Sequence, residues 1–155
     1  MIKYLVMDVD GTLTDGKIYM GNDGEVMKAF SIKDGCGIHD ILIPAGITPV
    51  IITGRKSDIL ENRCKEIGIK EIHQGVSNKI EKLLSVTSDL STVAYAGDDI
   101  NDLSAMIPIK EAGGKIGCPA DAVKKVKELA DFISSKNGGD GAVREFIEWL
   151  VSENV

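Results

Sequence analysis

The feature that most constrains the fold is the alternation of short apolar runs with helix-like segments along the whole chain. The runs cover residues 4–7, 49–52, 69–73, 92–96 and 115–118, and the helical patterns cover 36–46, 57–67, 77–87, 101–107 and 119–130. Strands that alternate with helices form crossover units around a parallel sheet. The run at 49–52 is apolar without alternation, which is typical of a central strand buried on both faces. We therefore predict an α/β fold with a doubly wound parallel sheet, in one domain over residues 1–155.

Two segments depart from this alternation. Residues 15–30 contain two strand-like arms on either side of Gly-Asn-Asp-Gly, a strong hairpin signal, where a simple crossover unit would have a helix. Residues 140–153 carry one apolar helical face and follow a glycine-rich loop. The chain is therefore expected to have a β-hairpin insertion after the first strand and a final helix.

Composition and charge exclude several classes of protein. With 43% apolar and 27% charged residues, the chain has the balance of a folded globular protein. It has no run of roughly 18 apolar residues that could span a membrane, and Asp8 and Asp10 interrupt the stretch where a signal peptide needs its apolar core. Three widely spaced cysteines without a CxxC motif suggest reduced thiols. We expect a cytoplasmic protein without membrane attachment.

A net charge of −6 argues against binding of nucleic acid through its phosphate backbone. A small anionic substrate remains possible, because a bound metal and a few basic side chains can reverse the potential inside one pocket.

Three of the predicted strands end in polar side chains. These are Asp8 and Asp10 after the first run, Thr53 and Arg55 after the second, and Asp98 and Asp99 after the fourth. Ligands of open parallel sheets bind beyond the carboxyl ends of the strands, so these groups should converge. Clustered carboxylates raise one another's pKa unless a cation compensates, and oxygen ligands suit Mg²⁺. The sequence therefore predicts a magnesium site at this edge.

These residues, in this order, resemble the motifs of the haloacid dehalogenase superfamily of phosphatases. The matching stretches are DVDGT at 8–12, TGR at 53–55, a lysine at 79 and GDDIND at 97–102. The resemblance implies that Asp8 attacks phosphorus and that Asp10 is the general acid and later the base for water. It also implies Mg²⁺ ligation by Asp8, the backbone carbonyl of Asp10 and Asp98.

The same resemblance assigns supporting roles. Asp99 and Asp102 would hold the metal or the catalytic geometry from behind the ligands. Thr53 would donate a hydrogen bond to a phosphoryl oxygen, and Lys79 would supply a fixed positive charge beside the nucleophile. Such charge is needed because a carboxylate that attacks a phosphate dianion is repelled by it.

A narrower resemblance is to 3-deoxy-D-manno-octulosonate (KDO) 8-phosphate phosphatases. It rests on DGKIYMGNDGEVMKAFSIKDGCGI at 15–38, ITGRKSDILENRCKEIGI at 52–69, HQGVSNK at 73–79 and GGDGAVREFIEWL at 138–150. It implies a capless enzyme of lipopolysaccharide biosynthesis that acts on a sugar-acid phosphate. It also implies a homotetramer in which hairpins meet at a central axis and a neighbouring subunit closes each site. Thr12 departs from this family, in which many relatives have Val.

Substrate contacts are expected from Thr53, Gly54 and three arginines. Guanidinium groups bind carboxylates through two parallel hydrogen bonds, which makes Arg55 and Arg63 the candidates for the carboxylate of the sugar acid. The family pattern implies that Arg144 reaches a neighbour's pocket. Lys33 and Asp34 are expected to line the entrance.

Three alternatives remain at this point. An N-acylneuraminate 9-phosphate phosphatase would use the same chemistry on a nine-carbon keto acid. A phospho-acceptor receiver domain also has clustered acids, but its acceptor belongs at the third strand, where this chain has Thr53. A catalytically idle sugar-binding or oligomerisation module would not require the intact set of acids.

Overall fold

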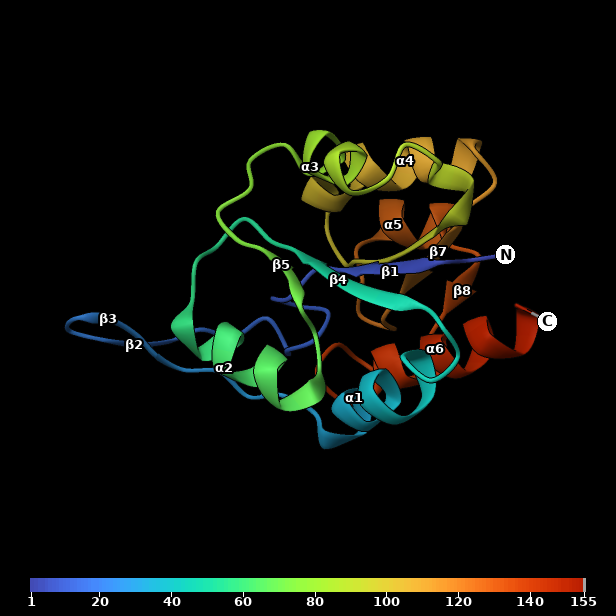
Figure 1. Cartoon of the computed structure of the whole chain (residues 1–155). Helices are drawn as coiled ribbons and strands as arrows, with labels where there is room; N and C mark the ends of the chain where they lie inside the picture. Colours follow the sequence, from blue (N-terminus) through green and yellow to red (C-terminus); the bar gives the residue numbers. More distant parts are fainter. Residues whose placement is uncertain (155) are drawn as a thin grey trace.

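A computed structural model describes residues 1–154 and places a six-stranded sheet at the centre of the molecule (Figure 1). The strands are β1 (Tyr4–Met7), β4 (Thr48–Ile52), β5 (Glu71–His73), β6 (Val93–Ala96), β7 (Lys115–Cys118) and β8 (Phe132–Ile133). Their order is β5-β4-β1-β6-β7-β8, and every neighbouring pair is parallel. The predicted doubly wound α/β architecture is confirmed, with the first strand in the middle.

Helices cover both faces of the sheet (Figure 1). One face carries α1 (Ile32–Cys36), which continues into a π-helical turn (Gly37–Leu42), together with α2 (Asp58–Ile67) and α6 (Ala142–Glu153). The other face carries α3 (Lys79–Val86), α4 (Leu103–Glu111) and α5 (Lys124–Leu129). Within residues 1–154, no helix has both the length and the apolar character that a membrane crossing needs.

The strands explain why the central runs lack alternation. Along β1, Leu5 and Met7 pack toward α2 and α6, whereas Val6 packs toward α3 and α4. Along β6, Ala94 and Ala96 face the first side and Tyr95 the second. Because each face has its own apolar layer, successive residues of a central strand are all buried.

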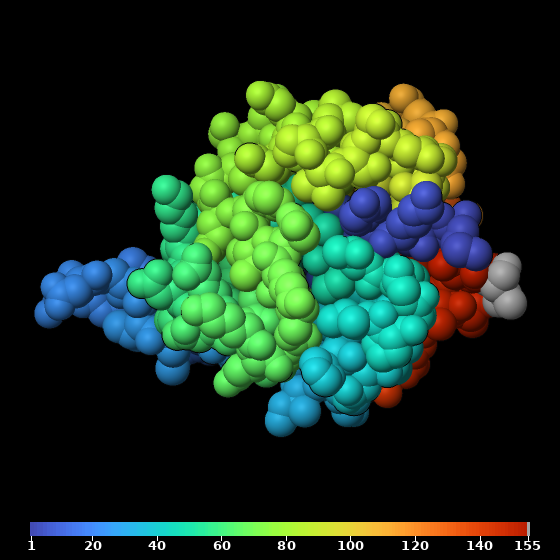
Figure 2. All heavy atoms as spheres, in the orientation of Figure 1, coloured from blue at the N-terminus to red at the C-terminus, as the bar shows by residue number. Residues whose placement is uncertain are grey.

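A β-hairpin follows the first strand, as predicted. Its arms are β2 (Tyr19–Gly21) and β3 (Gly24–Met27), which pair antiparallel and project away from the body of the molecule (Figures 1 and 2). Gly24 has φ +114°, a conformation that L side chains rarely adopt. Within the described residues the chain has no cap domain, and the hairpin is the only insertion between β1 and α1.

Several predicted helix boundaries were wrong. The segment predicted at 36–46 begins at Ile32, because Ser31 caps it by accepting a hydrogen bond from the Lys33 backbone, and it ends at Leu42, just before Pro44. The segment predicted at 119–130 begins only at Lys124, because backbone bonds tie the preceding loop elsewhere, from the Ala120 amide to the Lys136 carbonyl and from the Val123 amide to the Asp98 carbonyl. The two-residue strand β8 was not predicted, since so short a run carries no periodic signal.

Candidate active site

The acidic residues predicted at the strand ends come together at the carboxyl edge of β1 and β6. The Asp8 amide donates to the Ala96 carbonyl at 3.0 Å, which fixes the end of β1 against the end of β6. Each of Asp8, Asp98 and Asp102 offers a carboxylate oxygen, and these oxygens lie within 4.8 Å of one another. Residues almost a hundred positions apart in the chain therefore form one compact acidic cluster.

Asp102 is completely buried, and its carboxylate has four donors. Its Oδ2 accepts from the backbone amides of Asp98 and Asp99 at 3.1 and 3.2 Å. Its Oδ1 accepts from the Lys79 ammonium at 2.8 Å and from the Tyr95 hydroxyl at 2.7 Å. A carboxylate with this many donors has little left for a metal, so Asp102 fits a role behind the ligands.

Lys79 begins α3 and is buried against two carboxylates. Its ammonium lies 3.1 Å from Asp8 Oδ1 and 2.8 Å from Asp102 Oδ1. Burial alone would lower the pKa of Lys79, but the charges of Asp8 and Asp102 outweigh it and raise this pKa. The side chain is therefore a permanent cation beside the predicted nucleophile.

The other two acids are held in a cluster of like charge. Burial, followed by the charge of Asp102, raises the pKa of Asp8 to about 6. Burial, followed by the charges of Asp8 and Asp102, raises the pKa of Asp98 to about 7. A divalent cation between Asp8 and Asp98 would relieve this repulsion, and an oxygen-only donor set of this kind fits Mg²⁺.

Small residues make room for the cluster. Gly11 has φ +89°, and a Cβ there would lie 2.0 Å from Asp98 Oδ2. A Cβ at Gly97 would lie 2.6 Å from Asp102 Cγ. Thr12 donates its hydroxyl to Asp98 Oδ1 at 3.1 Å, a contact that sequence reasoning missed because Thr12 was read only as a departure from the family. Gly11 and Thr12 thus fix the position of the Asp98 carboxylate, and Gly97 leaves room for Asp102.

Asp10 is held by charges from the hairpin and from the loop that follows β4. Lys28, directly after β3, forms an ion pair with Asp10 Oδ1 and lies 3.2 Å from Glu25 Oε2. Arg55 lies 3.3 Å from the same Glu25 oxygen, and its Nε lies 3.9 Å from Asp10 Oδ2. Lys28 and Glu25 were not predicted as site residues; their only sequence signal is opposite charges placed in a hairpin arm.

Thr53 and Gly54 lie at the end of β4, beside this group. Thr53 is buried, and its backbone is fixed because its amide donates to the His73 carbonyl and its carbonyl accepts from the Val76 amide, both at 3.0 Å. A Cβ at Gly54 would meet only the Val76 carbonyl, at 3.6 Å. Asp99 is exposed, and its side chain caps the turn Ile100–Asp102 by accepting from the Ile100 amide at 2.7 Å.

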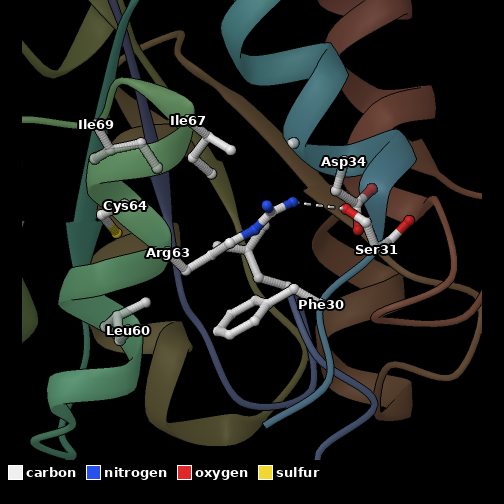
Figure 3. Close-up of a pocket in the computed structure, with 10 residues that line it drawn as sticks. Phe30, Ser31, Asp34, Leu60, Arg63, Cys64, Ile67 and Ile69 are labelled. Atoms are coloured by element: carbon white, nitrogen blue, oxygen red, sulfur yellow. Dashed lines mark hydrogen bonds between the residues drawn. The ribbon is translucent and has the colours of Figure 1, made fainter.

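Arg63 makes its contacts away from the acidic cluster, in a small pocket between α2 and α1 (Figure 3). Its Nη2 donates to the Ser31 carbonyl at 3.3 Å, and its guanidinium lies 5.9 Å from the centre of the Phe30 ring. A Cβ at Gly35 would lie 2.3 Å from Nη2, so this glycine admits the arginine. Within this chain, Arg63 fastens the segment that leaves the hairpin to α2.

Arg144 and Asp34 meet at the start of α6. Asp34 Oδ1 accepts from the Arg144 amide at 2.9 Å, while the Arg144 guanidinium binds Glu148 at 2.6 Å and the Lys33 carbonyl at 3.4 Å. The expectation that Asp34 lines the entrance is wrong for this chain, because Asp34 is only 2% exposed. Gly141 at the N-cap has no side chain, and Asp34 supplies the capping oxygen in its place.

Comparison with known proteins identifies close relatives, although no family model matches the chain. It is 42% identical over 154 residues to 3-deoxy-D-manno-octulosonate 8-phosphate phosphatase KdsC of Escherichia coli K12, covering 97% of this chain and 79% of the relative. The Yersinia pestis enzyme of the same name is 40% identical, over 97% of this chain and 80% of that enzyme.

Solved structures show the same similarity. The phosphatase of that name from Moraxella catarrhalis, crystallised with magnesium, phosphate and KDO, superposes with a TM-score of 0.89 at 39% identity, covering 97% of this chain and 86% of that one. The cobalt-bound Haemophilus influenzae enzyme gives a TM-score of 0.87 at 35% identity, covering 97% and 88%.

Proposed function

The chain belongs to the family of 3-deoxy-D-manno-octulosonate 8-phosphate phosphatases in the haloacid dehalogenase superfamily, and on that premise we propose that it is a Mg²⁺-dependent phosphatase of KDO 8-phosphate. The observation that carries the proposal is the position of Asp8. Its carboxylate lies at a strand end, 3.1 Å from the Lys79 ammonium and within 4.8 Å of an Asp98 oxygen. The names of the relatives favour the eight-carbon substrate over the nine-carbon alternative.

In the proposed mechanism, an Asp8 carboxylate oxygen attacks phosphorus as the bond from phosphorus to the sugar oxygen breaks. Asp10 donates its proton to that leaving oxygen, which gives KDO and an aspartyl-phosphate. Asp10 then takes a proton from water, which attacks phosphorus, breaks the acyl-phosphate bond and regenerates Asp8. Lys79 and the Thr53 hydroxyl neutralise and orient the phosphoryl oxygens.

Asp8, Asp98 and the backbone carbonyl of Asp10 are the proposed Mg²⁺ ligands. The bound ion would offset the negative charge that Asp8 and the phosphate bring together. Asp102, with its four donors, and Asp99, at the turn that follows, would hold Asp98 and Lys79 in position.

Arg55, Arg63 and Arg144 are proposed as contacts for the sugar acid. Arg55 is supported by its place beside Asp10, with its guanidinium about half exposed. Arg63 lies beside the segment that leaves the hairpin, and Arg144 lies in the first turn of α6. A role for either arginine in substrate binding would require a site shared with a neighbouring subunit.

A homotetramer built on the hairpin is part of the proposal. Met20, Val26 and Met27 on the hairpin are 64, 61 and 53% exposed, and an edge strand with apolar side chains calls for a partner. We expect V26E to lower the molar mass measured by light scattering while the far-ultraviolet circular dichroism stays unchanged. A wild-type protein that is monomeric at micromolar concentration would contradict this part.

We also propose that residues 1–155 act as a single catalytic domain in the cytoplasm, in lipopolysaccharide biosynthesis. The support is the nature of the substrate, since KDO is a sugar of that polymer. Fractionation of cells that produce the protein would test the compartment.

The experiment that tests the phosphatase is Mg²⁺-dependent phosphate release from KDO 8-phosphate and N-acylneuraminate 9-phosphate, side by side. We expect turnover of the first and a much lower kcat/KM for the second. The matched variant D8N should lose activity by at least about 10⁴-fold while keeping its fold, because an amide cannot attack phosphorus. Retained activity in D8N would exclude the covalent mechanism.

A further inference from the structure

Lys28 is a buried cation that the proposed mechanism does not use. Its side chain is 1% exposed, although it follows a hairpin strand whose neighbouring residues Val26 and Met27 face solvent. A lysine ammonium is almost never buried this deeply without partners, because the loss of hydration must be offset. The partners here are Asp10 and Glu25, both of which contact the ammonium directly.

The contacts of Lys28 belong to a closed ring of four charges. Lys28 joins Asp10 to Glu25, Glu25 accepts from Arg55 at 3.3 Å, and Arg55 returns to the second oxygen of Asp10 at 3.9 Å. Glu25 also accepts from the hydroxyl of Ser57, the N-cap of α2, at 2.9 Å. The ring therefore ties the loop after β1 to the hairpin and to the N-terminus of α2.

The ring determines which way the Asp10 carboxylate points. Lys28 binds Oδ1 and Arg55 faces Oδ2, so the two oxygens are held by cations from two different elements. An aspartate that must pass a proton to a leaving oxygen needs its carboxyl group held at the correct angle, and small misplacements lower rates steeply.

We propose that Lys28 is a positioning residue for Asp10, which acts through the hairpin to orient the general acid of the proposed phosphatase reaction. This inference depends on the role proposed for Asp10. Lys28 is too buried to be the main contact of a substrate, whereas Arg55, with a guanidinium about half exposed, remains accessible. The hairpin thus serves the chemistry of its own subunit, separately from any contact with other subunits.

The test compares two leaving groups. The oxygen that leaves KDO 8-phosphate is a primary alkoxide and needs a proton, whereas p-nitrophenolate leaves p-nitrophenyl phosphate as a stable anion without one. The rate to compare is that of leaving-group release in a single turnover with saturating enzyme in excess, because it reports phosphoryl transfer to Asp8 and not the later hydrolysis that both substrates share. We expect K28M to lower this rate for KDO 8-phosphate by about 10- to 100-fold and for p-nitrophenyl phosphate by less than about threefold. The ratio of the two rates does not depend on the fraction of enzyme that is folded. Should K28M not be recovered, K28Q gives the same ratio with a neutral side chain that keeps a polar end.

Controls separate this inference from the proposed function. K17M, a change to an exposed lysine before β2, should leave both single-turnover rates unchanged, and K28R should restore part of the selective loss. D10N should show the same selectivity for leaving group, more strongly. If D10N is not selective, the role of Asp10 itself fails. If D10N is selective but K28M lowers both single-turnover rates equally, only weakens substrate binding or changes nothing, the inference about Lys28 is overturned.

Discussion

The two aspartates of the DVD motif are only two residues apart, yet they belong to different parts of the molecule. Asp8 is 5% exposed and is held by Lys79 from α3, while Lys79 is in turn held by Asp102. Asp10 is held by Lys28 and Arg55, through a ring that includes the projecting hairpin. The proposed nucleophile is thus held by residues of the core of the fold, and the proposed general acid by Lys28 from the hairpin and Arg55 from the loop after β4.

This difference has a physical origin in the strand that precedes the motif. Asp8 continues the direction of β1 and is tied by its amide to β6, so its surroundings are the buried ends of the neighbouring strands. The chain turns at Gly11, and Asp10 lies beyond the last residue of β1 that pairs with β4 and β6. The charges that surround Asp10 must therefore come from loops and the hairpin, which are more mobile than a sheet.

Among the changes that leave Asp8 in place, the largest effect is expected on the side of the core, at Lys79. K79M leaves Asp8 and Asp102 buried without their shared cation, which should lower the free energy of unfolding by about 3–5 kcal/mol and kcat by roughly 10³-fold. Chemical denaturation and phosphate release measure the two. K82M, on the same helix, is the control and should change either quantity little. A K79M enzyme with wild-type kcat would contradict the role proposed for Lys79 as the cation beside Asp8.

Asp34, in the segment that follows the hairpin, is expected to make the free energy of unfolding depend on pH. Burial raises the pKa of Asp34 from 3.8 to about 6 in the folded protein. Because the folded state holds this proton more tightly than the unfolded state, the stabilisation is present below pH 3.8 and is lost as the pH rises through about 6. The loss is on the order of 3 kcal/mol.

The D34N variant isolates this contribution. Its amide oxygen can still accept from Arg144, but it does not titrate. The free energy of unfolding of the wild type, relative to D34N, should therefore fall between pH 4 and 7. D23N, at the exposed tip of the hairpin, should follow the wild type. A parallel pH dependence in wild type and D34N would show that Asp34 does not carry the effect.

Magnesium is expected to stabilise the core half of the site. An ion that binds only the folded state adds about 2.7 kcal/mol to the free energy of unfolding at 100 times its Kd. The shift is measured by thermal unfolding with Mg²⁺ against EDTA. It should be lost in D98N and kept in K28M, since Lys28 contacts the side chain of Asp10 and the proposed ligand is the backbone carbonyl of that residue. Equal shifts in wild type and D98N would rule out Asp98 as a ligand.

The smallest effect is expected at Tyr95. Y95F removes one of the four donors to Asp102, and Lys79 still binds the same oxygen. We expect a loss of about 1 kcal/mol in the free energy of unfolding and a change in kcat of less than about threefold. A loss of activity as large as that of K79M would mean that the network around Asp102 is more cooperative than its geometry indicates.

The grouping of the three acids and Thr53 at one edge of the sheet could be predicted because it depends on local patterns. Asp8, Asp10, Asp98 and Thr53 each follow an apolar strand, and the shared edge of a parallel sheet brings such ends together. The hairpin was equally readable, because Gly21-Asn22-Asp23-Gly24 is a turn signal complete in itself.

The partners of those acids were decided by the tertiary structure. Whether a lysine is a surface charge or a buried cation depends on segments far away in the chain, and Lys28, Tyr95 and Thr12 carry no local mark of the contacts they make. Arg63 was expected to bind the carboxylate of a substrate. In this chain its guanidinium instead donates to the Ser31 carbonyl and packs against the Phe30 ring. Local backbone preference places the chemistry along the sequence, but a charge acquires its function only when packing removes water and leaves specific neighbours in contact with it.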